Sequence, residues 1–373
     1  MTRTRRYQQL IAFRPLSAWL LGVALTLTLT LTLTMASRAQ AEDKPAEIRI
    51  AVPGVGIGNR PVTGGSATST AHLRGMLEEE FRKDGIKVTW TFLRGAGPAV
   101  NELYANNLVD ISPLGDLPSI IGRASGLRTR VLLSGGRFGN SYVGVPADSP
   151  IQSIKDLRGK RVAVFKGTAN QLQANRILAA HGLKENEVRI INMDTNASRT
   201  ALVTKDIDAS FGGSDLLALR DQGAVRIIYT TRNGDPTLTS NGTVIGSEAF
   251  LKRYPHIATR IVKVFLQAAK WIAEHESDPA QVYMLWTKSG VQFANYKEDY
   301  TGSSIKTRTT PLIDPYLSAR YNQSIADAKR FGLIKETFRF EDWADPSFLE
   351  AALKQLQLEG IWTALQVGGK PQS

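Results

Sequence analysis

Short runs of β-branched and apolar residues alternate with amphipathic stretches from about residue 48 onward. Apolar runs of four to six residues bounded by polar or glycine-containing segments are typical of strands. We expect strands over Ile48–Val52, Val88–Phe92, Asp110–Ser112, Arg130–Ser134, Tyr142–Val145, Arg161–Phe165, Val188–Ile191, Ala209–Phe211 and Val225–Tyr229. Residues spaced as on one helix face predict helices over Thr70–Arg82, Pro98–Ala105, Pro118–Ala124, Ala169–His181, Ala197–Lys205, Asp215–Gln222 and Pro255–Glu276, with a helical turn at Ile154–Leu157. This alternation predicts an α/β fold built on parallel sheets.

The alternating pattern restarts at Tyr142, and the last third of the chain is mostly helical. Two α/β sets are therefore expected, with the C-terminal helices packing back on one of them. The helix over Pro255–Glu276 carries a stripe typical of a buried core, formed by Ile257, Ile261, Val264, Phe265, Ala268 and Ile272.

Residues 1–41 are typical of a cleavable signal peptide. Four arginines precede an apolar run from about Trp19 to Met35, and the small-residue pattern Ala39-Gln40-Ala41 follows. A membrane anchor is the competing interpretation. The apolar run has roughly the shortest length that spans a bilayer, and threonine at every second place weakens that alternative. We expect cleavage after Ala41 and export of a soluble protein.

Composition and charge exclude several classes of function. The chain of 373 residues has no cysteine and four histidines, none of them at metal-ligand spacing, so no metal site and no cofactor is expected. The formal net charge of +12 falls to +7 once the five arginines of residues 1–41 are removed. Basic and acidic residues are interspersed, which argues against nucleic-acid binding. A mildly positive field suits a small anionic ligand.

Several segments share their order and spacing with one transport family. They are Glu80–Val88, Gly95–Pro98, Val109–Ile111, Gly115–Pro118, Asp148–Ile151, Ser153–Val164 and Lys166–Thr168. From about Ile48 to Gly290 the chain resembles the periplasmic substrate-binding proteins of ABC transporters for aliphatic sulfonates, taurine and nitrate. The resemblance implies the two-lobed periplasmic-binding-protein fold of type II, with the ligand in the cleft between the lobes and additional C-terminal helices.

The resemblance also implies the domain organisation and the partners. After the signal peptide, residues 42–141 would begin the first lobe, 142–240 would form the second, and 241–373 would return to the first and add the C-terminal helices. The protein is expected to be a periplasmic monomer that delivers a sulfonate-like anion to an inner-membrane permease. Alternatives are a binding protein for nitrate, sulfate esters or a pyrimidine-type ligand and, less favoured, an enzyme on the same fold, since neither a cysteine nucleophile nor a G-x-S-x-G motif is present.

Glycine-containing loops that open helices are the candidate anion-binding elements. The unpaired N–H groups of a helix N-terminus and the helix dipole together attract an anion. The loops at Gly95–Gly97, Gly115–Asp116 and Gly167–Asn170 fit this description, although each alone is equally typical of a capping turn. The candidate ligand-binding residues are Asn59, Gly97, Gly115, Asp116, Asn140, Ser141, Thr168, Ala169, Asn170, Ser214, Asp215 and Asn241.

Three loop features remain open to interpretation. Relatives often carry a tryptophan-centred stretch where this chain has Phe211–Asp215, and the two glycines there predict a larger pocket and a bulkier ligand, such as an aryl or longer-chain sulfonate. Asp215 is interpreted as a helix cap rather than a partner of a ligand amine, and Arg94 as a solvated arginine at the rim. The glycines of Pro53–Asn59 have the wrong spacing for a dinucleotide fingerprint.

Overall fold

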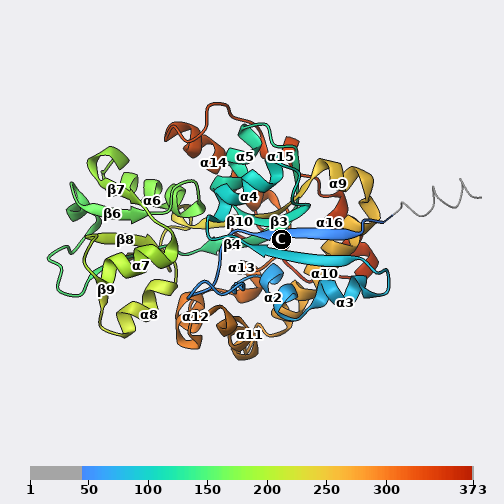
Figure 1. Cartoon of the computed structure of the whole chain (residues 1–373), viewed down its shortest axis with the longest axis horizontal. Coiled ribbons are helices and arrows are strands. Elements are labelled where there is room, and N and C mark those ends of the chain that lie inside the picture. Colours follow the sequence, from blue (N-terminus) through green and yellow to red (C-terminus); the bar gives the residue numbers. More distant parts are fainter. Residues whose placement is uncertain (1–43, 372–373) are drawn as a thin grey trace, which may run out of the picture. The chain divides into compact units, whose positions relative to one another are not determined.

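The computed structural model describes residues 44–371, so the predicted signal peptide lies outside the described residues. Ten strands form two five-stranded sheets (Figure 1). The first sheet has the order β2-β1-β3-β10-β4 and consists of β1 (Glu47–Val52), β2 (Lys87–Phe92), β3 (Ile111–Gly115), β4 (Thr129–Gly139) and β10 (Ser240–Ser247). The second has the order β7-β6-β8-β5-β9 and consists of β5 (Tyr142–Pro146), β6 (Arg161–Val164), β7 (Arg189–Asn192), β8 (Ala209–Gly212) and β9 (Val225–Thr230).

The helices connect these strands and extend the chain after β10. They are α2 (Ala67–Leu73), α3 (Met76–Arg82), α4 (Ala96–Ala105), α5 (Asp116–Ala124), α6 (Ala169–Ala180), α7 (Thr195–Val203), α8 (Asp215–Asp221), α9 (Glu248–Arg253), α10 (Pro255–Glu274), α11 (Ala280–Trp286), α12 (Phe293–Tyr300), α13 (Ile305–Arg308), α14 (Pro315–Arg330), α15 (Phe340–Trp343) and α16 (Ser347–Leu356). Short 3₁₀ turns lie at η1 (Ile154–Leu157), η2 (Glu185–Glu187), η3 (Pro236–Leu238) and η4 (Thr287–Ser289). Within residues 44–371, none of the helices combines the length and apolarity needed to cross a bilayer.

The sheets are mixed, so the prediction of parallel sheets was wrong, although every predicted strand is present. β10 runs antiparallel to β3 and β4, and β5 runs antiparallel to β8 and β9. Parallel neighbours need a crossover that leaves and re-enters the same sheet. Both β5 and β10 instead enter their sheet directly from the other one, and each therefore pairs in the opposite direction.

The predicted helix over Thr70–Arg82 is two helices. Gly75 has φ +61°, a left-handed conformation that ends the first helix and starts α3 in a new direction. Leu77 and Phe81 of the predicted apolar face are buried in α3, which explains why the periodicity continued across the break.

Alternate strand residues serve separate cores on the two faces of the first sheet. Ile48 and Ile50 pack with α2, α3, α10 and α16, whereas Ala51 faces the core formed with α4, α5, α14 and α15. Figure 1 shows these two groups of helices on opposite sides of the sheet. The predicted stripe of α10 is buried throughout, so that prediction is confirmed.

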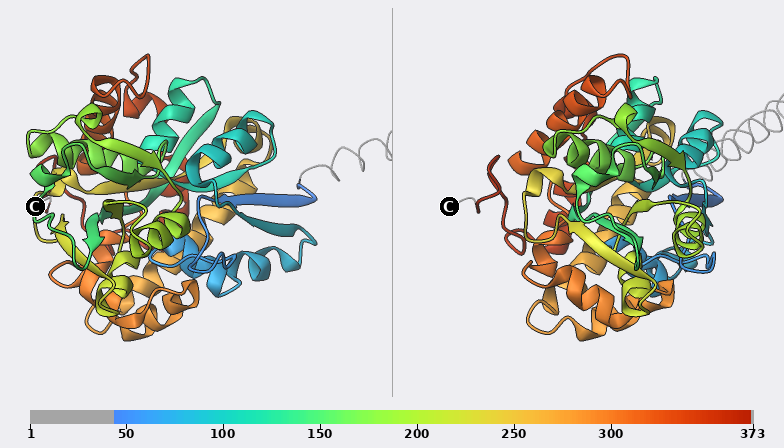
Figure 2. Two further views of the ribbon diagram at one scale, coloured as in Figure 1. Left: turned by 60° about the vertical axis from the view of Figure 1, so that its left-hand side comes forward. Right: turned by 90° about the vertical axis from the view of Figure 1, so that its left-hand side faces the viewer.

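The second sheet is covered in the same way. Val162 and Val164 pack against α6, and Ala163, between them, faces α7 and α8. Figure 2 brings this sheet and its helices toward the viewer. Leu172 of α6 is an exception, because it belongs to the core that α5 and α14 form on the first sheet. Helix α6 thus packs on the second sheet and also contacts α5 and α14 of the first.

The two connections between the sheets are fixed by polar contacts with C-terminal helices. Asn140 Nδ2 donates to a carboxylate oxygen of Asp299 in α12 at 3.0 Å, and the Tyr142 hydroxyl donates to the same oxygen at 2.8 Å. On the return connection, Arg320 of α14 donates to the Thr237 carbonyl at 2.7 Å. The C-terminal helices therefore hold both connections from outside the sheets.

Candidate functional site

A cavity of about 320 Å³ lies where loops of both sheets meet. Five helices begin at its wall. Their contributions are Ala96 and Gly97 of α4, Gly115 and Pro118 of α5, Thr168, Ala169 and Asn170 of α6, Asp194, Thr195 and Asn196 of α7, and Gly213 and Asp215 of α8. We call this space the anion cavity, because helix N-termini present N–H groups and a positive dipole end to whatever occupies it.

Two backbone N–H groups in the first turn of α6 have no hydrogen-bond partner within the described residues. The Thr168 hydroxyl donates to the Phe165 carbonyl at 2.7 Å instead of capping the helix, and Asn170 Oδ1 accepts from the Phe165 N–H at 3.0 Å. Among the described residues, no acceptor lies on the backbone N–H of Ala169 or Asn170. These two donors are available to a ligand.

Close contacts between the two sheets' loops shape the cavity wall. A Cβ atom on Gly167 would lie 2.8 Å from Pro98 of α4, so only glycine fits there, and its φ of +74° favours glycine as well. A Cβ atom on Gly97 would lie 2.3 Å from Pro118, which allows α4 and α5 to begin side by side. Ala96, directly before Gly97, has φ +49°, a strained conformation for a residue with a side chain.

Charged side chains of the wall are already paired. Arg94 Nη2 lies 3.3 Å from Asp194 Oδ2, which joins a loop of the first sheet to the N-terminus of α7. The Arg94 side chain is 61% exposed, as expected for an arginine at the rim. The anion cavity therefore depends on backbone donors rather than on a dedicated cationic side chain.

Asp215 is, with Asp194, one of two acidic residues that the described part of the chain places on this wall. Its Oδ1 accepts from the Gly213 N–H at 3.1 Å, and its Oδ2 lies 3.6 Å from Arg199 Nη1 without a hydrogen bond. Burial raises the pKa of this carboxyl, and the Arg199 guanidinium acts in the opposite direction. The interpretation of Asp215 as the helix cap was wrong, because Ser214 is the N-cap of α8 and the Gly213 N–H lies before the helix. The Asp215 carboxyl is instead part of the wall.

Seven of the twelve predicted site residues line the anion cavity, from both sheets. They are Gly97, Gly115, Asn140, Thr168, Ala169, Asn170 and Asp215. The structure also places Gly212 and Gly213 on this wall, where the sequence predicted that glycines widen the pocket.

The other five lie around the cavity rather than on its wall. The Asn59 side chain accepts from Asn196 of α7 at 3.1 Å, and Ser214 lines an adjoining cavity of about 290 Å³. The Ser141 N–H donates to Thr231 Oγ1 at 2.9 Å. Asn241 is buried, and neither polar atom of its amide has a partner among the described residues.

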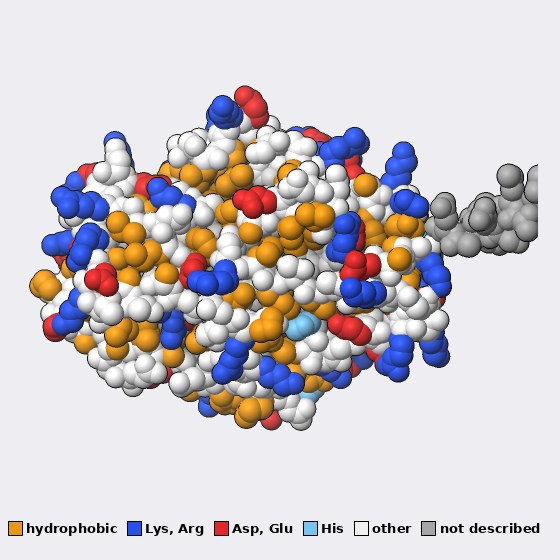
Figure 3. All heavy atoms as spheres, viewed as in Figure 1, with side chains coloured by type: hydrophobic (Ala, Val, Ile, Leu, Met, Phe, Trp, Pro, Cys, Tyr) orange, Lys and Arg blue, Asp and Glu red, His pale blue; other side chains and the backbone are white. Residues whose placement is uncertain are grey.

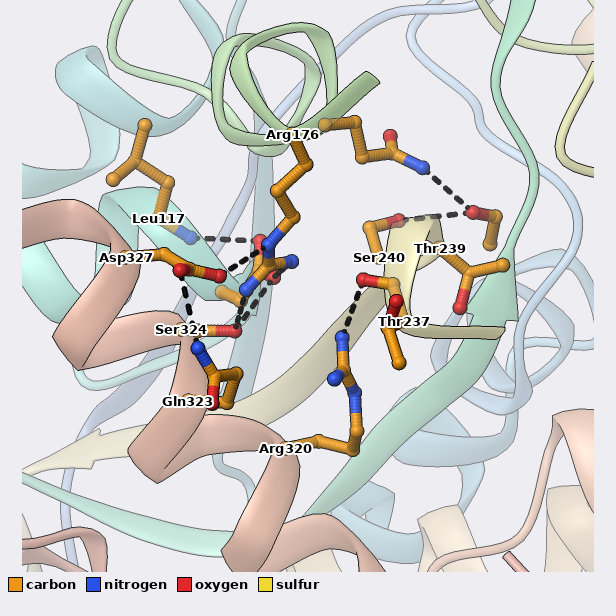
Figure 4. Close-up of polar contacts among 12 residues, drawn as sticks. Leu117, Arg176, Thr237, Thr239, Ser240, Arg320, Gln323, Ser324 and Asp327 are labelled. Carbon is orange, nitrogen blue, oxygen red and sulfur yellow. Dashed lines mark hydrogen bonds and ion pairs between the residues drawn. The ribbon is translucent and has the colours of Figure 1, made fainter. Parts of the chain in front are cut away.

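Asp116 belongs to a buried polar cluster that also contains Arg176 and Ser324, two residues labelled in Figure 4. One of its carboxylate oxygens accepts from the Leu117 N–H at 2.8 Å, and the other accepts from the Ser324 hydroxyl at 3.3 Å. Arg176 of α6 lies 3.7 Å from that second oxygen. The sequence placed Asp116 correctly at a helix start, but its side chain forms a hydrogen bond with Ser324 of α14, far along the chain, and does not line the cavity.

The start of α7 is the part of the wall that the sequence analysis missed. Asp194, Thr195 and Asn196 line the cavity, whereas the helix was predicted to begin only at Ala197. An aspartate directly after a strand and three residues before an apolar stretch is a recognisable N-cap, and Asp194 Oδ1 does accept from the Ala197 N–H at 2.9 Å.

The described residues hold no group of three or more histidine, aspartate or glutamate side chains arranged to bind a metal ion. Acidic and basic side chains are interspersed over the face shown in Figure 3. Within residues 44–371, the donors that the wall offers without a partner include the backbone N–H groups of Ala169 and Asn170.

Comparison with known proteins identifies the family. Residues 81–279 match the family model described as NMT1/THI5 like, which is more than half of the chain. The chain belongs to the NMT1/THI5-like family. A Bacillus subtilis protein of similar sequence, named an aliphatic sulfonates-binding protein, is 31% identical over 294 residues, covering 76% of this chain and 84% of that protein.

Solved structures of similar proteins agree with this membership of the NMT1/THI5-like family. A periplasmic sulfonate-binding protein of an ABC transporter from Methylobacillus flagellatus superposes with a TM-score of 0.72 at 30% identity, covering 87% of this chain and 98% of that one. A desulfurization enzyme superposes with a TM-score of 0.61 at 18% identity over 83% of this chain and 99% of its own, a likeness that shows the fold alone. The periplasmic-binding-protein fold predicted from the sequence is confirmed.

Proposed function

We propose that the protein is the soluble substrate-binding component of an ABC importer and captures a sulfonate or related small organic anion. The observation that carries this proposal is the convergence of helix N-termini on one cavity, with the N–H groups of Ala169 and Asn170 unpaired. A sulfonate has three oxygens and a fixed negative charge, which suits several backbone donors at once. Each such contact is worth about 0.3–1 kcal/mol, and up to ~2 kcal/mol where it is partly buried.

The proposed ligand contacts are Gly97, Gly115, Asn140, Thr168, Ala169, Asn170 and Asp215. The other five predicted residues are proposed to support this site without contacting the ligand. Asp116 lies in the buried polar cluster, Ser141 and Asn241 lie at the two connections, and Asn59 and Ser214 lie on adjoining surfaces. The names of the Bacillus and Methylobacillus relatives support a sulfonate as the ligand class.

Closure of two lobes is the proposed mechanism. Residues 42–141 and 241–373 would form one lobe around the first sheet, and residues 142–240 the other, with the two connections as hinges. The ligand shifts the molecule toward the closed form only if it binds that form more tightly. Donors from α4 and α6, on different sheets, reach the same anion only when the lobes are together, which provides that difference in affinity.

A binding function is favoured over catalysis. The similar proteins from Bacillus subtilis and Methylobacillus flagellatus carry the names of binding proteins, and the chain has no cysteine to serve as a nucleophile. We further propose that residues 1–41 are a signal peptide cleaved after Ala41, that the protein works as a monomer in the periplasm, and that an inner-membrane permease receives its ligand.

Thermal unfolding with a panel of anions tests the proposal. The protein, purified after export from a bacterial host, would be heated with alkanesulfonates, aryl sulfonates, sulfate esters, taurine, nitrate and pyrimidines. A ligand at 100 times its dissociation constant stabilises the protein by about 2.7 kcal/mol, which raises the unfolding midpoint. We expect this increase with sulfonates. An increase only with uncharged pyrimidines, or with none of the panel, would refute the proposed ligand.

A further inference from the structure

A second cavity of about 250 Å³ adjoins the anion cavity and has a different character. Three rings line it, those of Trp90 and Phe92 at the end of β2 and that of His72 in α2. Among the described residues, its wall includes no lysine, arginine, aspartate or glutamate. We call it the aromatic cavity.

The sequence builds this wall by strand alternation. Trp90 and Phe92 are two residues apart in β2, so their side chains leave the same face of the first sheet. The His72 ring lies between them, with its centroid 4.9 Å from the centroid of each. The Trp90 indole N–H donates to Glu78 Oε1 at 2.9 Å, which fixes the orientation of the indole ring.

His72 brings an uncharged ring to this wall. Its Nδ1 is buried and has no hydrogen-bond partner among the described residues. Burial lowers the pKa of the His72 ring, so the ring is neutral at pH 7. A neutral imidazole packed between two rings adds aromatic surface to the wall, but no charge with which to hold an anion.

The two cavities share part of their wall. Pro53, after β1, and Gly115, at the start of α5, line both of them. A ligand whose anionic group occupies the anion cavity can therefore extend past Gly115 into the aromatic cavity. A side chain at Gly115 would lie 3.0 Å from Ala169, so glycine leaves room at this junction.

We propose that the aromatic cavity binds the organic part of the sulfonate, and that this part is an aromatic ring. The inference rests on the proposed function, since it needs the anionic group to occupy the neighbouring cavity. Offset or edge-on contacts with Trp90, Phe92 and His72 select a planar ring over a short alkyl chain. Methanesulfonate, which carries a single methyl group, has no ring with which to make these contacts.

Calorimetric titration with benzenesulfonate and methanesulfonate tests the inference. Benzenesulfonate is expected to bind at least tenfold more tightly than methanesulfonate. Trp90→Ala should reduce this ratio to less than threefold and leave the affinity for methanesulfonate unchanged. Trp271→Ala is the matched control, because it also removes a partly buried indole, but one that packs against Arg74 and His275 away from both cavities.

Trp90 also packs against the core of the first sheet, so a second variant protects the test against misfolding. Phe92→Leu keeps an apolar side chain and removes the ring, and it should weaken benzenesulfonate binding about threefold with methanesulfonate unchanged. Equal affinities for the two ligands, unaffected by either variant, would overturn the aromatic cavity as a ligand site while the proposed function stands. Failure of both sulfonates to bind the wild-type protein would refute the proposed function itself.

Discussion

Asp215 is the residue whose charge opposes the anion that the cavity is proposed to bind. Its side chain lines the cavity, is 13% exposed and has one oxygen without a hydrogen bond. Burial raises its pKa above the ordinary value, against the effect of Arg199. A nearby negative ligand disfavours the ionised carboxyl further.

Replacing Asp215 by Asn is therefore expected to tighten sulfonate binding several-fold at pH 7. In the wild type, affinity should rise as the pH falls through the raised pKa of Asp215, because protonation removes the repulsion while the sulfonate stays ionised. Titration calorimetry between about pH 4 and 7 measures both effects. Asp215→Asn should have a flatter pH profile, and Asp221→Asn on the exposed end of α8 should keep the wild-type profile. A steeper profile for Asp215→Asn would contradict this account.

Helix α6 links the anion cavity to the C-terminal helices. Its first turn lines the cavity, and two turns further Arg176 Nε donates to Asp327 Oδ2 at 2.8 Å and Nη2 donates to the Ser324 hydroxyl at 2.9 Å. Gln173, between them, lines the cavity and donates to the Gly139 carbonyl of the first connection at 2.8 Å. One helix thus contacts the proposed ligand, a connection and α14.

We expect Arg176→Leu to destabilise the protein strongly. Removing one partner of a buried ion pair leaves an uncompensated charge and costs about 3–5 kcal/mol. Arg330→Ala is the matched control, since Arg330 pairs with the same Asp327 at 2.9 Å but its side chain is 60% exposed. That change should cost less than about 1 kcal/mol. Equal losses for the two variants, measured by urea unfolding, would show that burial of Arg176 has no special role.

At the scale of single helices and strands, the sequence predicted an element correctly where that element's own pattern decides its structure. The strand of Val88–Phe92 and the apolar stripe of α10 each follow one local periodicity. β10 was not predicted as a strand, because Gly242 and Gly246 interrupt its apolar pattern and its partners β3 and β4 lie more than a hundred residues earlier.

The candidate site shows the same division. Helix starts were predictable from glycine, threonine and asparagine in short loops, and most of those loops do meet at the anion cavity. The direction of a side chain was not predictable when a distant element decides it, as with Asp116 and Ser324. The aromatic cavity was also missed, since the predicted helix through His72 gave no indication that its ring faces β2.

At the scale of the whole molecule, ion pairs join the helices of the two sheets at separate places. Besides Arg176 and Asp327, Arg220 of α8 donates both terminal nitrogens to the Glu298 carboxylate of α12, each at 2.7 Å. This contact lowers the pKa of Glu298. Its contribution to stability is present above the ordinary glutamate pKa of 4.5 and is lost as the pH falls through the lowered value.

Glu298→Gln is expected to weaken sulfonate binding a few-fold at low salt and neutral pH, because the pair favours the closed arrangement of the lobes. The difference from wild type should shrink at high salt, where partly exposed pairs are screened, and as the pH falls through the lowered pKa of Glu298, where the carboxylate becomes protonated. Glu79→Gln, which alters an exposed pair within α3, is the control and should match the wild type. A difference that is independent of salt would refute the electrostatic explanation.

The position of β10 has a consequence for how the chain acquires its structure during synthesis. β10 lies between β3 and β4, so the first sheet remains in two pieces until residue 247 of 373 has been added. The residues of the second sheet, by contrast, are contiguous and complete at Thr230. Pairing over such long separations forms slowly. A nascent chain of this protein therefore lacks its complete first sheet through most of its translation. Such a state is compatible with threading through a membrane pore before folding.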